Sequence, residues 1–212
     1  MIKAIIFDFG DIFINLDKKG AINRTKIAFG DDIITEKPNT KNKDIFKVND
    51  AYEKGELSSS QFIAFYKTLN KNLTNNDVAK LWNSLIKDFP KYRLEFIKQL
   101  AKEKKYKLIL LSNTNALHIE QVIDNMTLER YNDFKSCFDK FYLSHEIHFR
   151  KPNKDIFEFV LHENHLKAKD CLFVDDTIDN TNTAAKMGIH TWHLIPGKDD
   201  VVNLFKTKKD LF

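Results

Sequence analysis

The fold is decided by a short apolar run, IKAIIF at residues 2–7, which is followed at once by Asp8-Phe9-Gly10-Asp11. An apolar run of this length that stops at Asp and Gly predicts a buried strand ending in a loop. Four similar runs follow, and helical patterns separate them: Leu108–Leu111, Phe141–Leu143, Leu172–Val174 and Ile189–Ile195. Strands that alternate with helices are typical of a parallel sheet, so we expect an α/β fold with helices flanking the sheet.

Between the first and second runs, residues 18–91 contain no strand-like segment and show helical patterns instead. Ser58 with Gln61, and Thr74 with Asp77, have the spacing of capping boxes at helix starts. The other helices are expected at Lys19–Phe29, Lys43–Lys54 and Lys91–Lys104. We therefore predict a helical cap, residues 17–91, inserted into a core domain made of residues 1–16 and 92–212.

Composition narrows the class of protein. The chain has 212 residues, of which 42% are apolar and 30% charged, with a net charge of +4. No apolar run approaches the roughly 18 residues that a membrane span needs, so we expect no membrane association. The basic residues are scattered, which argues against a nucleic-acid partner. Two cysteines, Cys137 and Cys171, cannot build a disulfide framework or a zinc site, and a cytoplasmic protein is the expectation.

Polar side chains stand at or shortly after the ends of four of the predicted strands. Ligands of parallel sheets bind beyond the carboxyl ends of the strands, so the topology is expected to bring these residues together. They are Asp8, Ser112-Asn113, Lys151 and Asp175-Asp176. Alone, each could be a turn, capping or surface residue. The adjacent carboxylates of Asp175 and Asp176 are harder to explain without a cation, because like charges at a buried strand end repel.

This set of groups fits phosphoryl transfer. Asp8 can attack phosphorus and form an aspartyl-phosphate, which divides hydrolysis into two steps. Mg²⁺ prefers a few carboxylate or carbonyl oxygens, which Asp8 and Asp176 can provide. The Ser112 hydroxyl and the Asn113 backbone N–H can donate to the phosphoryl oxygens. The ammonium group of Lys151 can neutralise the charge that develops on the nucleophile and the phosphate.

The motifs resemble those of the haloacid dehalogenase (HAD) superfamily, in which Mg²⁺-dependent phosphatases predominate. Asp8 resembles the nucleophile of motif one, Ser112-Asn113 motif two, Lys151-Pro152 motif three and Val174–Thr177 motif four. The resemblance implies a Rossmann-like core and a phosphatase acting on small phosphorylated substrates, such as sugar or nucleoside phosphates. The stretch Tyr52–Ser58 is similar to the cap of bacterial members related to glucose-1-phosphate phosphatases.

The same resemblance implies a ligand set for Mg²⁺. It consists of the carboxylates of Asp8 and Asp176 and the backbone carbonyl of Gly10, with Asp175 acting indirectly. Most phosphatases of the superfamily carry a second aspartate two residues after the nucleophile, where it protonates the leaving group. Gly10 occupies that position here, and Asp11 follows it. We interpret Asp11 as a turn residue in preference to a substitute acid. The similar glucose-1-phosphate phosphatases also have Gly at this position and still hydrolyse phosphate esters.

Two other functions fit part of the pattern. A non-catalytic phosphate-binding module would keep the Mg²⁺ and phosphate sites but have lost its acid at Gly10. A 2-haloacid dehalogenase also attacks with an aspartate, but it needs no Mg²⁺ and gives the Asp175-Asp176 pair no role. Metal dependence separates the dehalogenase from the phosphatase. The sequence does not indicate the substrate, the oligomeric state, the cap residues that contact substrate, or the group that protonates the leaving oxygen.

Overall fold

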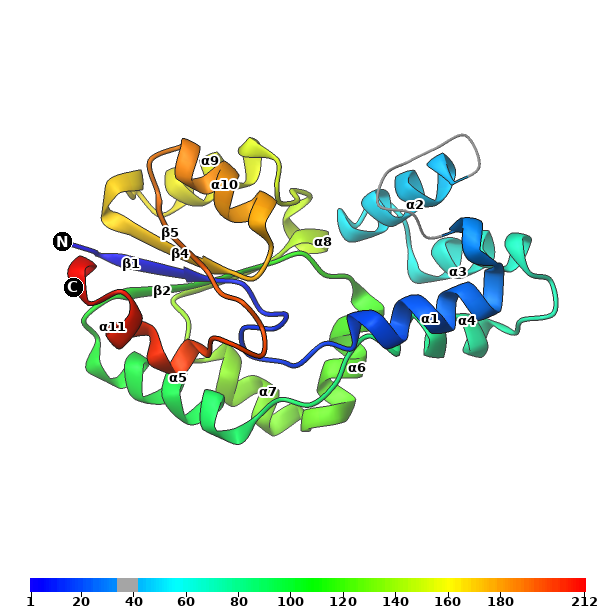
Figure 1. Cartoon of the computed structure of the whole chain (residues 1–212), viewed down its shortest axis with the longest axis horizontal. Coiled ribbons are helices and arrows are strands. Elements are labelled where there is room, and N and C mark those ends of the chain that lie inside the picture. Colours follow the sequence, from blue (N-terminus) through cyan, green and yellow to red (C-terminus); the bar gives the residue numbers. More distant parts are fainter. Residues whose placement is uncertain (34–41) are drawn as a thin grey trace.

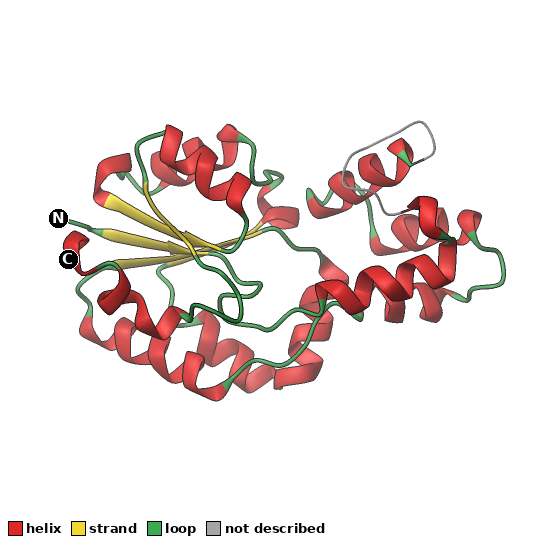
Figure 2. Cartoon of the chain, in the orientation of Figure 1, coloured by secondary structure: helices red, strands yellow, loops and turns green. Residues whose placement is uncertain are grey.

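A five-stranded sheet forms the centre of the computed structural model, which describes residues 1–33 and 42–212 (Figures 1 and 2). The strand order is β3-β2-β1-β4-β5, and every neighbouring pair is parallel. The strands are β1 (Ala4–Phe7), β2 (Lys107–Ser112), β3 (Lys140–Leu143), β4 (Cys171–Asp175) and β5 (His190–His193). The predicted α/β class and all five predicted strands are confirmed. The apolar run that opens the chain supplies the central strand β1, whose four residues are all buried.

Helices cover both faces of the sheet (Figure 1). On one face, Ile6 and Phe173 pack against α9 (Lys154–Glu163) and α10 (Ile178–Lys186). On the other face, Ile5, Phe7 and Leu110 pack in a second core cluster with α5, α6, α7 and α11. These helices are α5 (Lys91–Glu103), α6 (Ala116–Met126), α7 (Leu128–Lys135) and α11 (Leu204–Thr207). Successive residues of β1 therefore face opposite helical layers, as expected for a strand buried on both sides.

Within the described residues, four helices and a short 3₁₀ helix lie beside the sheet and form what we call the helical insertion (Figure 1). They are α1 (Lys18–Phe29), η1 (Asp31–Ile33), α2 (Lys43–Glu53), α3 (Ser59–Leu69) and α4 (Asn75–Asn83). Both predicted capping boxes are present, at the starts of α3 and α4. The insertion has its own core, in which Tyr52, Phe62 and Tyr66 are buried. The position of the division between cap and core, at residues 17 and 91, stays a prediction.

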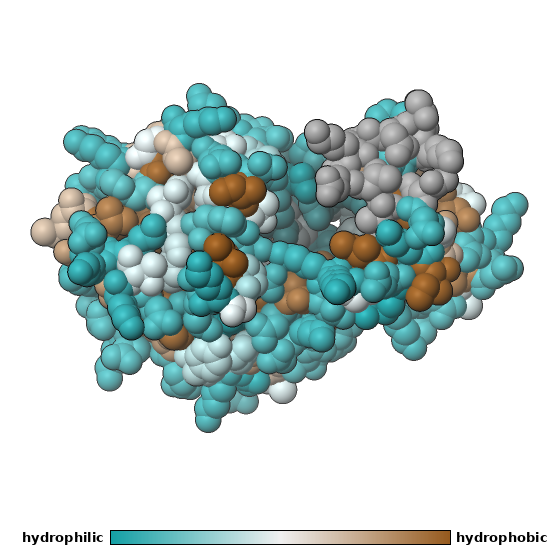
Figure 3. Space-filling view, in the orientation of Figure 1, coloured by the Kyte–Doolittle hydropathy of each residue, from teal (hydrophilic) through white to brown (hydrophobic). Residues whose placement is uncertain are grey.

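The remaining elements are short. They are α8 (Ser144–Ile147), η2 (Ala168–Asp170), η3 (Val201–Asn203) and η4 (Lys209–Leu211). None of the described helices is long and apolar enough to cross a membrane. The face seen in the space-filling view is mainly hydrophilic, and its apolar side chains form small separate patches (Figure 3).

Candidate active site

The carboxyl ends of three neighbouring strands bring the predicted residues together. Asp8 follows β1, Ser112 ends β2 and Asp175 ends β4, and β1 lies between the other two strands. Lys151 reaches these strand ends from the loop that follows α8, and only 1% of its side chain is exposed. Its Nζ donates to Asp8 Oδ1 at 2.8 Å, to Asp175 Oδ2 at 2.7 Å and to the Leu111 carbonyl at 2.7 Å. The ammonium group thus has three acceptors and directly contacts the expected nucleophile.

Asn113 holds the backbone of Lys151 in place. Its side-chain oxygen accepts from the Lys151 backbone N–H at 2.9 Å, and its Nδ2 donates to the Lys151 carbonyl at 2.8 Å. This two-bonded clamp joins the loop after β2 to the loop that carries the ammonium group. From the sequence we expect only the backbone N–H of Asn113 to contact phosphate, so the clamp is an additional role for its side chain. Neighbouring Ser112 is buried, and its hydroxyl makes one long hydrogen bond, 3.5 Å, to the Asn113 carbonyl.

The carboxylates of Asp8, Asp175 and Asp176 form a cluster in which one oxygen from each lies within 4.8 Å of the others. Asp175 is the most heavily bonded of the three. Besides Lys151, it accepts from the Thr177 backbone N–H at 2.7 Å and, with each of its oxygens, from Asn180 Nδ2 at 3.0 Å. Hard oxygen donors at a partly buried site suit Mg²⁺. Because Asp175 is occupied by donors from the protein, Asp8 and Asp176 are better placed to hold a cation directly.

The electrostatics of the cluster also favour a cation. The pKa of Asp8 is raised to about 7, chiefly by burial and also by the charges of Asp175 and Asp176, while the charge of Lys151 and its hydrogen bond oppose the shift. Burial likewise raises the pKa of Asp176, against the effect of a hydrogen bond from Lys18. The protein alone therefore does not fully compensate the negative charge that it buries. A bound cation would stabilise the ionised form of Asp8 that nucleophilic attack requires.

Lys18, the first residue of α1, also reaches this cluster. Its ammonium group pairs with Asp11 Oδ2 at 2.8 Å and with Asp176 Oδ2. Asp11 lies in the predicted turn with a φ of +53°, and its other oxygen accepts from the Leu16 backbone N–H at 3.0 Å. Both oxygens of Asp11 are thus engaged, which supports its interpretation as a turn residue over that of a free acid. A Cβ at Gly10 would lie 2.8 Å from Leu16 Cδ1, so an added side chain there would have to displace Leu16.

The helical insertion contacts the loop that follows motif two. Trp82 Nε1 donates to Asn115 Oδ1 at 3.2 Å, and the Trp82 carbonyl lies 3.2 Å from His118 Nε2. The rings of Trp82 and His118 stack with centroids 5.2 Å apart. Asn115 is the N-cap of α6 and stands two residues after Asn113. The insertion therefore packs against the start of the helix that follows the predicted phosphate-binding residues.

A second contact lies beside Lys151. Arg150 pairs with Glu53 of α2, and its Nη1 lies 3.6 Å from Asp50 Oδ1. Two residues before Arg150, His148 Nδ1 donates to the Lys54 carbonyl at 2.7 Å. These contacts involve the stretch Tyr52–Ser58, which resembled the cap of related phosphatases. That stretch thus joins the insertion to the core next to the buried ammonium group.

His118 gives the contact between insertion and core a pH dependence. Burial lowers the pKa of His118 to about 4, against the smaller effect of its hydrogen bond to the Trp82 carbonyl. A group whose folded pKa is depressed contributes stability above its unfolded pKa of about 6.5 and loses that stability as pH falls towards 4. We expect the free energy of unfolding to fall by up to about 3 kcal/mol over this range on account of His118.

Urea unfolding at several pH values between 4 and 7 measures this effect. His118→Gln should flatten the pH dependence relative to the unmodified protein, whereas His190→Gln, at an exposed position of β5, should leave it unchanged. Equal slopes for the unmodified protein and His118→Gln would contradict the assignment.

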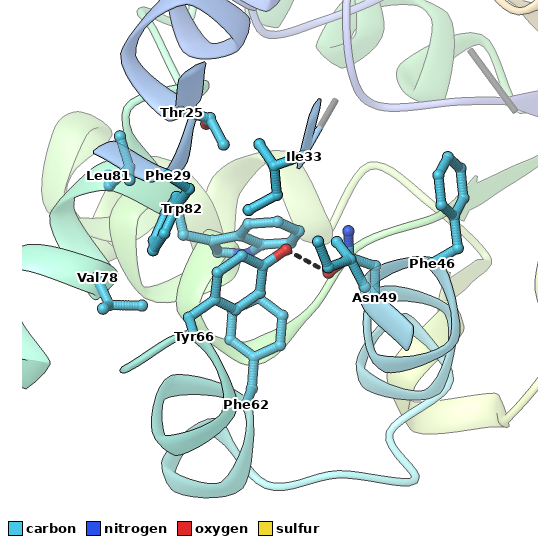
Figure 4. Close-up of a pocket in the computed structure, with 11 residues that line it drawn as sticks. Thr25, Phe29, Ile33, Phe46, Asn49, Phe62, Tyr66, Val78, Leu81 and Trp82 are labelled. Carbon is cyan, nitrogen blue, oxygen red and sulfur yellow. Dashed lines mark hydrogen bonds between the residues drawn. The ribbon is translucent and has the colours of Figure 1, made fainter. Parts of the chain in front are cut away.

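An apolar cavity of about 280 Å³ lies within the insertion, between its helices (Figure 4). Its wall includes Phe62, Trp82 and Tyr66, whose hydroxyl donates to Asn49 Oδ1 at 2.8 Å. None of the strand-end residues lines this cavity. It is therefore separate from the candidate active site.

Comparison with protein families agrees with the geometry. A family model described as haloacid dehalogenase-like hydrolase matches residues 2–188, which include every strand-end residue discussed above. The chain belongs to this family. Its place among the haloacid dehalogenase-like hydrolases confirms the predicted superfamily and identifies the protein as a hydrolase.

Individual relatives of this haloacid dehalogenase-like hydrolase span nearly its full length. It is 28% identical over 201 residues to a D-ribitol-5-phosphate phosphatase of Bacteroides thetaiotaomicron, covering 94% of this chain and 95% of the relative. A HAD family enzyme of the same organism, solved with magnesium and inorganic phosphate, is 30% identical, with a TM-score of 0.76 and coverage of 94% and 97%. A predicted HAD-like hydrolase of Porphyromonas gingivalis is 28% identical, with a TM-score of 0.78 and 98% coverage of both chains. None of these three is described as a glucose-1-phosphate phosphatase, so that finer resemblance stays a prediction.

Proposed function

We propose that this protein is a Mg²⁺-dependent phosphatase that hydrolyses small phosphomonoesters through an aspartyl-phosphate on Asp8. The observation that carries the proposal is the buried contact of Lys151 with Asp8 and Asp175, in a cluster of carboxylates that Asp176 completes. This arrangement places a nucleophile, a fixed positive charge and oxygen ligands for a cation at one edge of the sheet. Those are the groups that phosphoryl transfer to a carboxylate requires.

Each side chain has a defined part in this proposal. Asp8 accepts a hydrogen bond from Lys151 with one oxygen, and its other oxygen attacks phosphorus as the bond from phosphorus to the leaving alkoxide oxygen breaks. Water then attacks the aspartyl-phosphate, which releases inorganic phosphate and regenerates the carboxylate. Ser112 Oγ and the Asn113 backbone N–H donate to the phosphoryl oxygens. Lys151 neutralises the charge that gathers as the bond to Asp8 forms.

We assign the Mg²⁺ site to the acidic cluster and to the turn that follows Asp8. Asp8, Asp176 and the Gly10 carbonyl are the proposed direct ligands, and Asp175 acts indirectly through the groups that it orients. When bound, Mg²⁺ neutralises phosphate charge and the mutual repulsion of the carboxylates. The pairing of Asp175 with Lys151, Thr177 and Asn180 supports this division of roles.

The substrate is proposed to be a small sugar, polyol or nucleoside phosphate. The helical insertion supports this size class, because it contacts the loops that carry Asn113 and Lys151 and would act as a cap over the site. A cap that closes on those loops excludes water during transfer and limits the size of the substrate. The relative that hydrolyses D-ribitol 5-phosphate makes polyol phosphates the first compounds to test.

Release of inorganic phosphate tests the proposal. The panel is p-nitrophenyl phosphate, D-ribitol 5-phosphate, several sugar phosphates and nucleoside monophosphates, each with Mg²⁺ and with EDTA. We expect release that requires Mg²⁺ and returns when excess Mg²⁺ follows the chelator. Activity unaffected by EDTA, or halide release from 2-chloropropionate without phosphate release, would contradict the phosphatase. Binding of Mg²⁺ and phosphate without turnover of any ester would support the non-catalytic module.

A further inference from the structure

The backbone of Lys18 begins the first helix of the insertion, and its ammonium group lies among the carboxylates that follow the strands of the sheet. Its ammonium group lies between Asp11 and Asp176, whose side chains are 10% and 7% exposed, while its own side chain is 50% exposed. Lys151, by contrast, is 1% exposed and lies beneath the cluster. The two lysines therefore neutralise the carboxylates from opposite sides, one from the interior and one from the solvent-facing side.

Lys18 lowers the net negative charge of the carboxylate cluster. Among the described residues, the cluster joins four carboxylates, Asp8, Asp11, Asp175 and Asp176, to the ammonium groups of Lys18 and Lys151. With all six groups ionised the cluster has a net charge of −2, which one divalent cation neutralises. Asp176 is the carboxylate that both cations would contact. It pairs with the ammonium group of Lys18 and is also a proposed ligand of Mg²⁺.

We propose that Lys18 competes with Mg²⁺ for Asp176 and thereby sets the affinity of the site for the metal. The inference rests on the proposed function, because it concerns the same Mg²⁺ site. Without metal, Lys18 holds Asp11 and Asp176 together and limits their repulsion. With metal, the ammonium group and the ion share one carboxylate and repel each other, so the affinity for Mg²⁺ is lower than the carboxylates alone would give.

Calorimetric titration of MgCl₂ into the metal-free protein tests this inference without an activity assay. Lys18→Met and Lys18→Gln should each lower the dissociation constant for Mg²⁺ by on the order of tenfold, because a positive charge beside the site is removed. Lys18→Arg keeps the charge and should keep the affinity near that of the unmodified protein. Lys19→Met is the matched control, because it removes the same charge from the next, exposed residue of α1.

Thermal unfolding of the same variants provides a second measurement. Metal-free Lys18→Met should be less stable than the unmodified protein, and saturating Mg²⁺ should raise its Tm by more. If Lys18→Met and Lys18→Gln bind Mg²⁺ as the unmodified protein does, or more weakly, competition by Lys18 is wrong while the proposed metal site stands. If the unmodified protein and every variant fail to bind Mg²⁺, the proposed function is overturned together with this inference.

Discussion

Asp8→Asn is expected to lower phosphate release from every substrate by about four orders of magnitude or more, the scale of effect seen when a catalytic nucleophile or triad partner is removed. The amide has the shape of the carboxylate but is no nucleophile towards phosphorus. Lys151 retains Asp175 Oδ2 and the Leu111 carbonyl as acceptors, and the asparagine oxygen can replace Asp8 Oδ1. The fold should therefore persist while the chemistry stops.

The measurement is steady-state phosphate release with saturating Mg²⁺, paired with the Tm of each protein. Asp155→Asn, at an exposed position in the first turn of α9, is the matched control and should keep full activity. The Tm of metal-free Asp8→Asn should not fall, because the variant removes one of several crowded carboxylates. Residual activity above about 1% of the unmodified protein would show that another group attacks phosphorus.

Lys151→Met is expected to abolish activity and also to destabilise the fold. Methionine has nearly the length of lysine but no charge, so Asp8 and Asp175 would lose the buried ammonium group that they share. Removing one partner of a buried ion pair costs about 3–5 kcal/mol of the free energy of unfolding. Urea unfolding of the metal-free protein measures this loss, and phosphate release measures the loss of activity.

Two further variants separate the causes of that loss. Lys154→Met, at an exposed position of α9 where the lysine pairs with Glu158 one turn along the helix, should cost no more than about 0.5 kcal/mol. Adding Asp8→Asn to Lys151→Met should recover part of the lost stability, because one of the two uncompensated carboxylates disappears. A loss below about 1 kcal/mol in Lys151→Met, or no recovery in the double variant, would contradict the burial of charge described above.

The sequence allowed the strand-end residues to be predicted because a general rule of topology applies to them. Parallel neighbours end at the same edge of the sheet, so Asp8, Ser112 and Asp175 could be placed together once their strands had been recognised. The apolar runs were strong enough for that recognition, since β1 and β4 are buried along their whole length. The two capping boxes were predictable for a similar reason, because their bonds form within four residues of chain.

Other parts of the site could not be predicted, because they depend on contacts between side chains from distant segments. Lys18 meets Asp176 across 158 residues, and the clamp between Asn113 and Lys151 joins residues 38 apart. No spacing rule links such positions in a single sequence. A lysine at the start of an exposed helix is also most often a solvated residue. The pairing of Arg150 with Glu53 could not be predicted for the same reason, because the two residues are far apart in the sequence. The stretch that contains Glu53 was nevertheless predicted to be part of the cap.

The two contacts of the helical insertion have a thermodynamic consequence. Asn115 and Arg150 bind the insertion, and they stand within two residues of Asn113 and Lys151. The contacts of the insertion and the residues proposed to bind phosphate therefore lie on the same two stretches of backbone. Linkage is reciprocal. If docking of the insertion strengthens phosphate binding, bound phosphate stabilises the docked insertion by the same free energy. We therefore expect inorganic phosphate, the product of the proposed reaction, to stabilise the docked insertion as well.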